Sequence, residues 1–260
     1  MRVENELKFE DATPNPEYLI KSIAEQGYTL ETAIADLIDN SISAQSDEIE
    51  VLLDNKVRPY TLYLADNGAG MDEATLKKAL RFPSTSSDTG RDQSDLGRFG
   101  LGLKTASFSQ TRSFTVLSRP KGKMKYSGRT WDIDVLKKQK KWKIIVNSNK
   151  EIKSFVAKHK KISESQINGF KKFEANTIII WNGLFKYENY IEESDPQKVL
   201  DRELTEVTKE YLSLTFHRFL ARNRSPLNIR LNNVRVEPFD PFPDSEEGFR
   251  AIENKKRLFG

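Results

Sequence analysis

The stretch between Tyr28 and Ala106 constrains the fold most, because it carries three short polar and glycine-rich segments in a fixed order. The segments are ETAIADLIDNSISA (31–44), LADNGAGMD (64–72) and DLGRFGLGLKTASFS (95–109). Each segment alone has an ordinary explanation: a solvated helix face, an Asn-Gly turn and a flexible loop. Their order and spacing favour one common site, to which all three segments contribute.

The first segment predicts an amphipathic helix that begins near Thr29, a suitable N-cap, with Glu31 in its first turn. Apolar residues recur at helical spacing, and the polar residues between them form the opposite face. On that polar face, Asp36 and Asn40 lie one turn apart. A carboxylate there can orient or deprotonate a water molecule, and an amide oxygen is a hard ligand that suits Mg²⁺.

The second segment predicts a strand over 60–64 that ends in a tight turn. Gly68 and Gly70 let the backbone approach a planar ring closely or take a positive φ. Asp66, just before them at the strand end, can accept a hydrogen bond from an exocyclic amine such as adenine N6. The turn is equally typical of an ordinary Asn-Gly connection.

The third segment predicts an anion site. Gly97, Gly100 and Gly102 lead into a helical segment, where backbone N–H groups face a ligand and Lys104 adds a positive charge. The spacing is not that of a Walker P-loop, which has four residues between its glycines and then Gly-Lys-Ser/Thr. It is not a dinucleotide-binding fingerprint either, because no strand ends just before Gly97.

Together the three segments resemble those of the GHKL ATPases, the superfamily of gyrase, the large heat-shock chaperone, histidine kinases and MutL. The motifs DLIDNS, DNGAGMD and GRFGLGLKTAS are most similar to those of the Microrchidia (MORC) ATPases and their prokaryotic counterparts. The stretch 176–181 resembles a late strand of the family, whose Thr supports the adenine-binding Asp. The family usually has Gly where this chain has Asn176. The resemblance spans about residues 15–240.

After residue 113 the apolar pattern alternates at every second residue, which predicts strands with short links and antiparallel pairing. We expect an α+β fold: a two-layer sandwich with a mixed, mostly antiparallel sheet covered by helices on one face. The resemblance implies the same architecture, the Bergerat ATP-binding fold. It places an ATP-binding domain at 1–225, with a lid at about 83–103, and a transducer-like segment or C-terminal extension at 226–260.

The resemblance also implies ATP and Mg²⁺ as ligands and assigns roles to the motif residues. Asp66 would read adenine, Asn40 would hold Mg²⁺, Lys104 would hold the phosphates and Asp36 would direct the attacking water. The implied nucleotide-binding residues are Asn40, Ala44, Asp66, Gly68, Gly70, Met71, Gly97, Gly100, Leu101, Gly102, Leu103, Lys104 and Thr177.

The sequence departs from the hydrolysing members of the family at Asp36, where they have a Glu as general base. An Asp is one methylene shorter, and misplacing a catalytic group on that scale can cost on the order of a hundredfold in rate. Three outcomes stay open: slow hydrolysis with Asp36 as base, hydrolysis with a shifted water, or binding with little turnover. We expect slow hydrolysis, because a carboxylate still stands in place.

The composition excludes several classes of protein. The 260 residues contain 42 Lys and Arg against 38 Asp and Glu, so the net charge is only +4. The absence of cysteine excludes disulfides and thiolate metal sites, and two histidines disfavour a histidine-rich metal site. The charged N-terminus does not have the form of a signal peptide, and no apolar run approaches the ~20 residues of a membrane span. We therefore expect a soluble cytoplasmic protein without a membrane partner.

The resemblance implies ATP or ADP as ligand, an ATP-dependent homodimer and a DNA or protein client. Two alternatives stay open. A nucleic-acid-binding module with a vestigial ATP site would use the lysine-rich stretch 137–161, which otherwise predicts a solvated sheet edge. A histidine-kinase-like phosphotransferase would need a phosphoacceptor histidine on a preceding helical hairpin, and no histidine precedes the pocket in this sequence.

Overall fold

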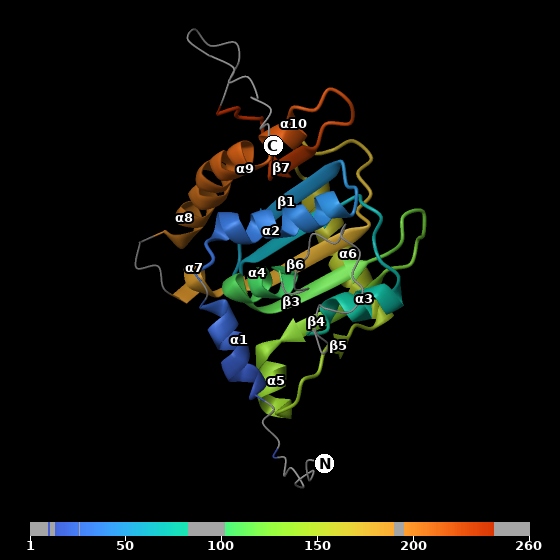
Figure 1. Cartoon of the computed structure of the whole chain (residues 1–260), viewed down its shortest axis with the longest axis vertical. Coiled ribbons are helices and arrows are strands. Elements are labelled where there is room, and N and C mark those ends of the chain that lie inside the picture. The colour runs from blue at the N-terminus through green and yellow to red at the C-terminus, as the bar shows by residue number, and fades with distance from the viewer. Residues whose placement is uncertain (1–9, 11–13, 26, 83–101, 190–194, 242–260) are drawn as a thin grey trace, which may run out of the picture.

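An eight-stranded sheet forms the centre of the computed structural model, which describes residues 10, 14–25, 27–82, 102–189 and 195–241 (Figure 1). The strand order is β5-β4-β3-β6-β2-β1-β7-β8. Among the described strands, β1 and β7 pair in parallel and all other neighbours pair antiparallel. The predicted α+β sandwich with a mixed, mostly antiparallel sheet is therefore confirmed.

The strands are β1 (Glu48–Asp54), β2 (Thr61–Asp66), β3 (Thr111–Ser118), β4 (Ser127–Asp132), β5 (Ile145–Val146), β6 (Thr177–Leu184), β7 (Asn228–Leu231) and β8 (Val234–Arg235). The helices are α1 (Pro16–Ala24), α2 (Leu30–Ser43), α3 (Glu73–Leu80), α4 (Gly102–Gln110), α5 (Ile133–Gln139), α6 (Asn149–Glu164), α7 (Phe185–Asn189), α8 (Pro196–Arg202), α9 (Lys209–Thr215) and α10 (His217–Leu220). A π-helical turn, η1 (Glu203–Thr208), joins α8 to α9.

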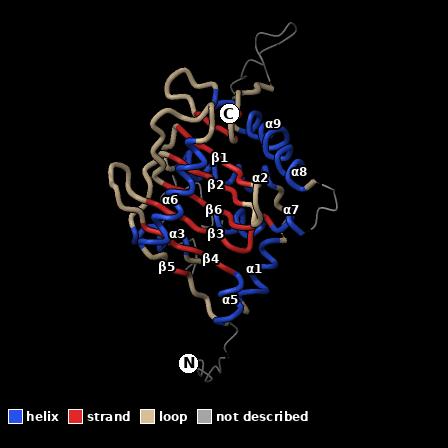
Figure 2. The backbone as a smooth tube through the Cα atoms, turned by 180° about the vertical axis from the view of Figure 1, so that it is seen from behind, coloured by secondary structure: helices blue, strands red, loops and turns tan. Residues whose placement is uncertain are grey.

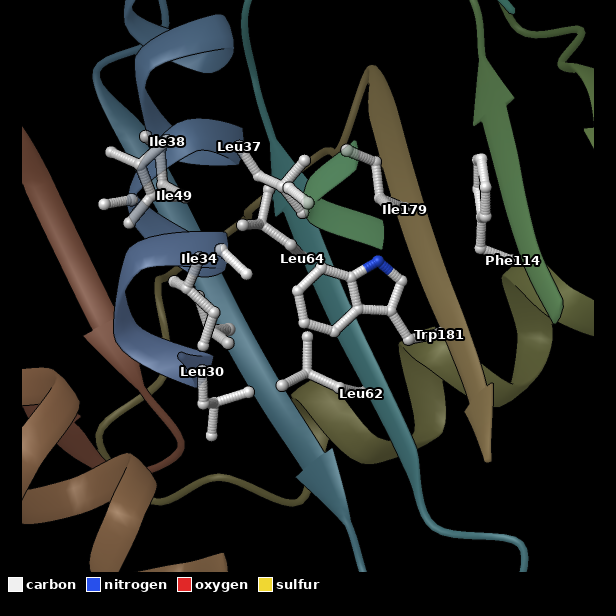
Figure 3. Packing of buried hydrophobic residues seen from close by; sticks show 14 of the residues in the cluster. Leu30, Ile34, Leu37, Ile38, Ile49, Leu62, Leu64, Phe114, Ile179 and Trp181 are labelled. Atoms are coloured by element: carbon white, nitrogen blue, oxygen red, sulfur yellow. The ribbon is translucent and has the colours of Figure 1, made fainter. Parts of the chain in front are cut away.

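The main core lies between α2 and one face of the sheet (Figure 3). Leu30, Ile34, Leu37 and Ile38 recur at helical spacing on α2 and are all buried. They face alternate residues of β1, β2, β3 and β6, which point to the same face because side chains alternate along a strand. The labelled strand residues of this core are Ile49, Leu62, Leu64, Phe114, Ile179 and Trp181. Since Asp66 has the parity of Leu62 and Leu64, the alternation directs it toward α2.

A second, smaller core lies on the opposite face of the sheet, under α6 (Figure 2). Ile152 of α6 packs there with buried residues of the same central strands, including Leu117 and Ile178. The apolar pattern of the sequence predicted helices on one face only and gave no indication of α6. The lysine-rich stretch 137–161 was expected to be a solvated sheet edge, whereas only Ile145–Val146 forms a strand there and Asn149–Glu164 is helical.

The chain from Pro196 to Leu220 is helical, but the helix is interrupted. In η1 the hydroxyl of Thr208 donates to the carbonyl of Glu203, five residues earlier (2.7 Å), and the next break is at Phe216. After it, β7 and β8 form a hairpin, and β7 pairs with β1 within the same sheet.

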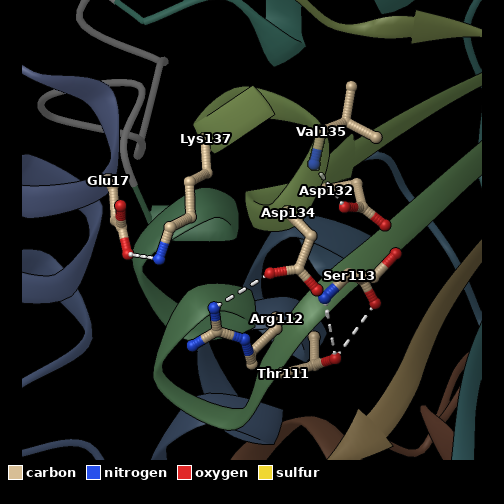
Figure 4. Close-up of polar contacts among 8 residues, drawn as sticks. All are labelled: Glu17, Thr111, Arg112, Ser113, Asp132, Asp134, Val135 and Lys137. Carbon is tan, nitrogen blue, oxygen red and sulfur yellow. Dashed lines mark hydrogen bonds and ion pairs between the residues drawn. The ribbon is translucent and has the colours of Figure 1, made fainter. Parts of the chain in front are cut away.

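At the opposite end of the sheet, charged contacts orient α5 (Figure 4). Lys137 Nζ lies 3.1 Å from Glu17 Oε1 of α1, and Arg112 of β3 lies 3.2 Å from Asp134 Oδ1. Such exposed pairs contribute only ~0–1 kcal/mol each. The buried side chain of Leu136 supplies the packing between α5 and the core.

Candidate functional site

The centre of the site is the carboxylate of Asp66, at the end of β2. Its side chain is 4% exposed, although it is ionisable. Oδ1 accepts the N–H of Gly68 (2.9 Å), and Oδ2 accepts the hydroxyl of Ser41 from α2 (3.2 Å). Burial raises the pKa of Asp66 from 3.8 to about 6, against the lowering effect of these two hydrogen bonds. None of the ion pairs formed by the described residues includes Asp66, so this buried carboxylate has no counter-ion among them.

The two glycines of the turn are required by close backbone approaches. A Cβ at Gly68 would lie 2.7 Å from the carbonyl oxygen of Ala44, the C-cap of α2. A Cβ at Gly70 would lie 1.9 Å from the carbonyl oxygen of Arg119, and Gly70 also has a φ of +66°. The N–H of Ala69 donates to Ala44 O (2.8 Å). The turn is therefore clamped between the end of α2 and the chain that follows β3.

Residues of β3 and β6 support the turn from the sheet. Thr177 is the register partner of Asp66 in the β2–β6 pair, and its hydroxyl lies 3.0 Å from that of Ser118. Ser118 Oγ in turn accepts the N–H of Met71 (2.8 Å). Thr177 thus acts on the turn through Ser118, and no direct side-chain hydrogen bond joins it to Asp66 among the described residues.

Asn176, the departure from the family's usual Gly, braces the same turn. Its amide nitrogen donates to Gly68 O (2.8 Å) and to Asn67 O (3.1 Å), and its backbone N–H donates to Asp66 O (2.7 Å). A glycine could supply only the last of these three bonds. The larger residue therefore makes the turn more rigid.

The polar face of α2 carries Asp36 and Asn40 as predicted. Asn40 Nδ2 donates to the backbone carbonyl of Asp36 (2.9 Å), which leaves its Oδ1 as the atom available to a cation. The hydroxyl of Tyr28 donates to Asp36 Oδ2 (2.6 Å). Burial and the Asp36 carboxylate together raise the pKa of Tyr28 to about 12, so this hydroxyl remains a donor. Burial, and then the charge of Asp36, raise the pKa of Asp39.

Lys104 lies in the first turn of α4, but its ammonium group is buried. Nζ donates to the carbonyl of Ala79 near the end of α3 (2.8 Å) and lies 5.7 Å from the ring centroid of Phe82. The side chain is 1% exposed, and burial lowers the pKa of Lys104 to about 8. To reach a phosphate, this ammonium group would have to exchange the Ala79 carbonyl for the ligand.

Part of the predicted site lies outside the described residues. These positions are Gly97, Gly100 and Leu101, together with the rest of residues 83–101 of the lid predicted at about 83–103. Gly102 is exposed at the start of α4, and Leu103 packs partly against the main core. The described part of the site therefore consists of α2, the turn after β2, the strand ends of β3 and β6, and α4.

The sequence did not identify four residues that contribute to the site, namely Tyr28, Ser41, Ser118 and Asn176. Ser41, Ser118 and Tyr28 act through contacts between distant elements, which no local pattern reveals. The signal for α6 was local: Ser148 and Glu151 have the spacing of a capping box, and Ser148 Oγ and N–H both lie 2.7 Å from Glu151 Oε2. For Asn176, the amide at a position where the family has Gly was visible, but its partners were not.

The described residues offer few side chains to a metal ion. Within them, no group of three or more His, Asp or Glu side chains could hold a metal ion. A cation at Asn40 would therefore depend on oxygen atoms of the nucleotide and of water. None of the described helices is both long and apolar enough to cross a membrane.

A sheet with a buried strand-end carboxylate, a glycine turn beside it and a helix carrying Asp and Asn defines an ATP-binding module of the GHKL type. Residues 28–168 match the family model described as "Histidine kinase-, DNA gyrase B-, and HSP90-like ATPase", and the chain belongs to this family. The match begins at Tyr28 and includes α2, the turn after β2, and α4 to α6. No curated protein matches the chain.

Proposed function

We propose that this domain binds ATP with Mg²⁺, hydrolyses it slowly, and uses the cycle to change its shape or its association with a second copy. The observation that carries the proposal is the buried Asp66 carboxylate, which has no counter-ion among the described residues. Keeping a charge in such a place is costly unless a ligand compensates it. The exocyclic amine of adenine is a donor of the right kind for that carboxylate.

The remaining roles follow from the positions around Asp66. Asn40 Oδ1 would be a ligand of Mg²⁺, which prefers oxygen atoms and retains water and phosphate ligands. Gly68, Gly70 and Met71 would line the base site, with Thr177 and Ser118 behind them. The start of α4, with Gly102 and Lys104, would face the phosphates.

Asp36 would direct the attacking water, and its short side chain supports slow rather than fast turnover. Among the described residues, Tyr28 is the hydrogen-bond partner of its carboxylate. Oδ1 accepts no hydrogen bond from the described residues and so remains for a water molecule.

Homodimerisation on ATP binding and a DNA or protein client are part of the same proposal. For a nucleic-acid client, the specific observation is the solvent-facing side of α6. Its exposed lysines are Lys150, Lys153, Lys158, Lys160 and Lys161. If these lysines bound the phosphate backbone of a nucleic acid, the affinity would fall as the salt concentration rises. Phosphotransfer through a histidine is less well supported, because His159 is buried beside Glu50 (2.9 Å).

The test is calorimetric titration of the chain with a non-hydrolysable ATP analogue, with and without Mg²⁺, followed by sizing in both states. Binding at micromolar or lower concentration that requires Mg²⁺, with a shift to dimer, is the expected result. Binding without a change in size would remove the dimerisation part alone. Absence of binding would overturn the assignment of the base site to Asp66.

A further inference from the structure

The contact between Tyr28 and Asp36 has a geometry that the helix itself does not require. Tyr28 lies eight residues before Asp36, and its hydroxyl donates to Oδ2 at 2.6 Å, the short distance typical of a hydrogen bond to a charged oxygen. The N-terminus of α2 is closed separately: Thr29 N–H donates to Thr32 Oγ1 (3.0 Å), and Ala33 N–H donates to Thr29 O (3.1 Å). Tyr28 is therefore not the cap of this helix.

The backbone of Tyr28 is held on its other side by two elements from distant parts of the chain. Lys186 of α7 donates from Nζ to Tyr28 O (2.8 Å). Gln110, the last residue of α4, is 1% exposed and donates from Nε2 to Tyr28 O (3.4 Å) and to Thr29 O (3.2 Å). The phenol is thus presented from a backbone that α4 and α7 hold in addition to its connection with α2.

This arrangement can compensate for the short side chain of Asp36, the general base in the proposed function. The side chain of Asp36 turns about two bonds, and only part of its rotation directs an oxygen toward a bound nucleotide. A hydrogen bond to Oδ2 restricts that rotation, and Oδ1 remains without a partner among the described residues. One oxygen of the carboxylate is held while the other is left for a water molecule.

We propose that Tyr28 is a positioning residue for hydrolysis: its hydroxyl holds Asp36 so that the free carboxylate oxygen meets the attacking water. The proposal rests on the proposed ATPase function with Asp36 as base. Tyr28 acts through Asp36 and does not need to touch the nucleotide. Loss of its hydroxyl should therefore lower the rate of the chemical step and leave the affinity for nucleotide unchanged.

The experiment compares Tyr28→Phe with wild type and with Tyr18→Phe, a matched control at a tyrosine of α1 that is 69% exposed. For each protein, kcat and KM for MgATP, the Kd of a non-hydrolysable analogue and the melting temperature are measured. We expect Tyr28→Phe to lower kcat by about tenfold to a hundredfold, the loss associated with a misplaced catalytic group, with Kd within about twofold of wild type. Tyr18→Phe should match wild type in all four quantities.

A second comparison separates action through Asp36 from direct action on the nucleotide. Single-turnover rates with enzyme in excess are measured for Asp36→Ala and for Asp36→Ala combined with Tyr28→Phe. We expect the second substitution to cause no further loss, since no carboxylate remains to be held. A further loss equal to that seen in the wild-type background would overturn the inference.

The possible failures are distinguishable. A wild-type chain that binds MgATP but does not hydrolyse it would overturn the ATPase proposal and this inference with it. Turnover that Asp36→Ala abolishes and Tyr28→Phe leaves intact would overturn this inference alone. A Tyr28→Phe variant with unchanged kcat and weakened Kd would likewise reject the positioning role.

Discussion

Replacement of Asp66 by Asn should make the nucleotide-free domain more stable and should weaken nucleotide binding. Asp66 Oδ1 accepts the Gly68 N–H, and an amide oxygen can do the same. At the other position, Ser41 Oγ lies 3.2 Å from both Asp66 Oδ2 and Leu37 O. With an amide nitrogen in place of Oδ2, Ser41 can donate to Leu37 and accept from the new group. The substitution therefore leaves no buried polar atom of this set without a partner.

The size of the effect follows from the pKa of Asp66, which burial raises from 3.8 to about 6. At 1.36 kcal/mol per pH unit, keeping the carboxylate ionised in the folded state costs about 3 kcal/mol at neutral pH. Because the folded-state pKa is the higher one, the relative stabilisation is complete below about pH 4 and is lost as the pH rises through 6. The variant lacks this group, so its gain over wild type should be about 1 to 3 kcal/mol at pH 7 and should shrink toward pH 4.

The assay is urea unfolding of both proteins at several pH values between 4 and 7.5, with titration of an ATP analogue at pH 7.5. Loss of a hydrogen bond to a charged group is worth about 1.5 to 3 kcal/mol, so affinity should fall by at least about tenfold. Asp72→Asn is the control, because Asp72 is an exposed N-cap and its charge is not buried. The pKa of Asp72 is lowered by the Thr75 N–H, in the direction opposite to that of Asp66. Equal stability of Asp66→Asn and wild type across the pH range would refute the desolvation argument, and unchanged affinity would refute the base-site assignment.

Three further substitutions test other parts of the site. Asp36→Ala should spare binding of the analogue and reduce ATP turnover by about a hundredfold or more, measured as phosphate release. Lys104→Met should weaken analogue binding by about tenfold or more, as expected for loss of a charged phosphate contact. In wild type, Lys104 should also make stability rise between about pH 8 and 10.5, because burial lowers its pKa in the folded state; the Met variant should lack this rise in unfolding experiments. Gly70→Ala should destabilise the fold by about 2 kcal/mol or more through its clash with Arg119 O, whereas Gly122→Ala, with a φ of +79° and no atom within 4 Å, should show the smaller cost of positive φ alone.

Local patterns predicted the framework of the site well. The periodicity of residues 31–44 predicted the buried and polar faces of α2, and the alternation in 60–64 predicted the strand that carries Asp66. Helical periodicity and strand alternation depend only on residues within one or two turns of each other, so they can be recognised in a single sequence. The α+β architecture followed from the change of period after residue 113.

The contacts that complete the site could not be predicted in the same way. The hydrogen bond from Lys104 Nζ to Ala79 O depends on the end of α3 lying beside α4, which no local pattern predicts. The Ser118–Thr177 contact joins residues 59 positions apart, and its existence depends on the pairing of β3 with β6. Helix α6 was missed because its lysines weakened the apolar pattern, and its capping box was not recognised.

The two buried charges, Asp66 and Lys104, favour ligand binding more strongly together than either does alone. Each is almost fully buried. Burial raises the pKa of Asp66 and lowers the pKa of Lys104, so it favours the neutral form of both groups. A domain of this size has only ~5–15 kcal/mol of stability, so both groups lower it by a substantial fraction when no ligand is bound. A nucleotide presents a donor to a carboxylate at its base and negative oxygens to an ammonium group at its phosphates. Under the proposed function, one nucleotide would compensate both charges, whereas adenine or phosphate alone would compensate only one.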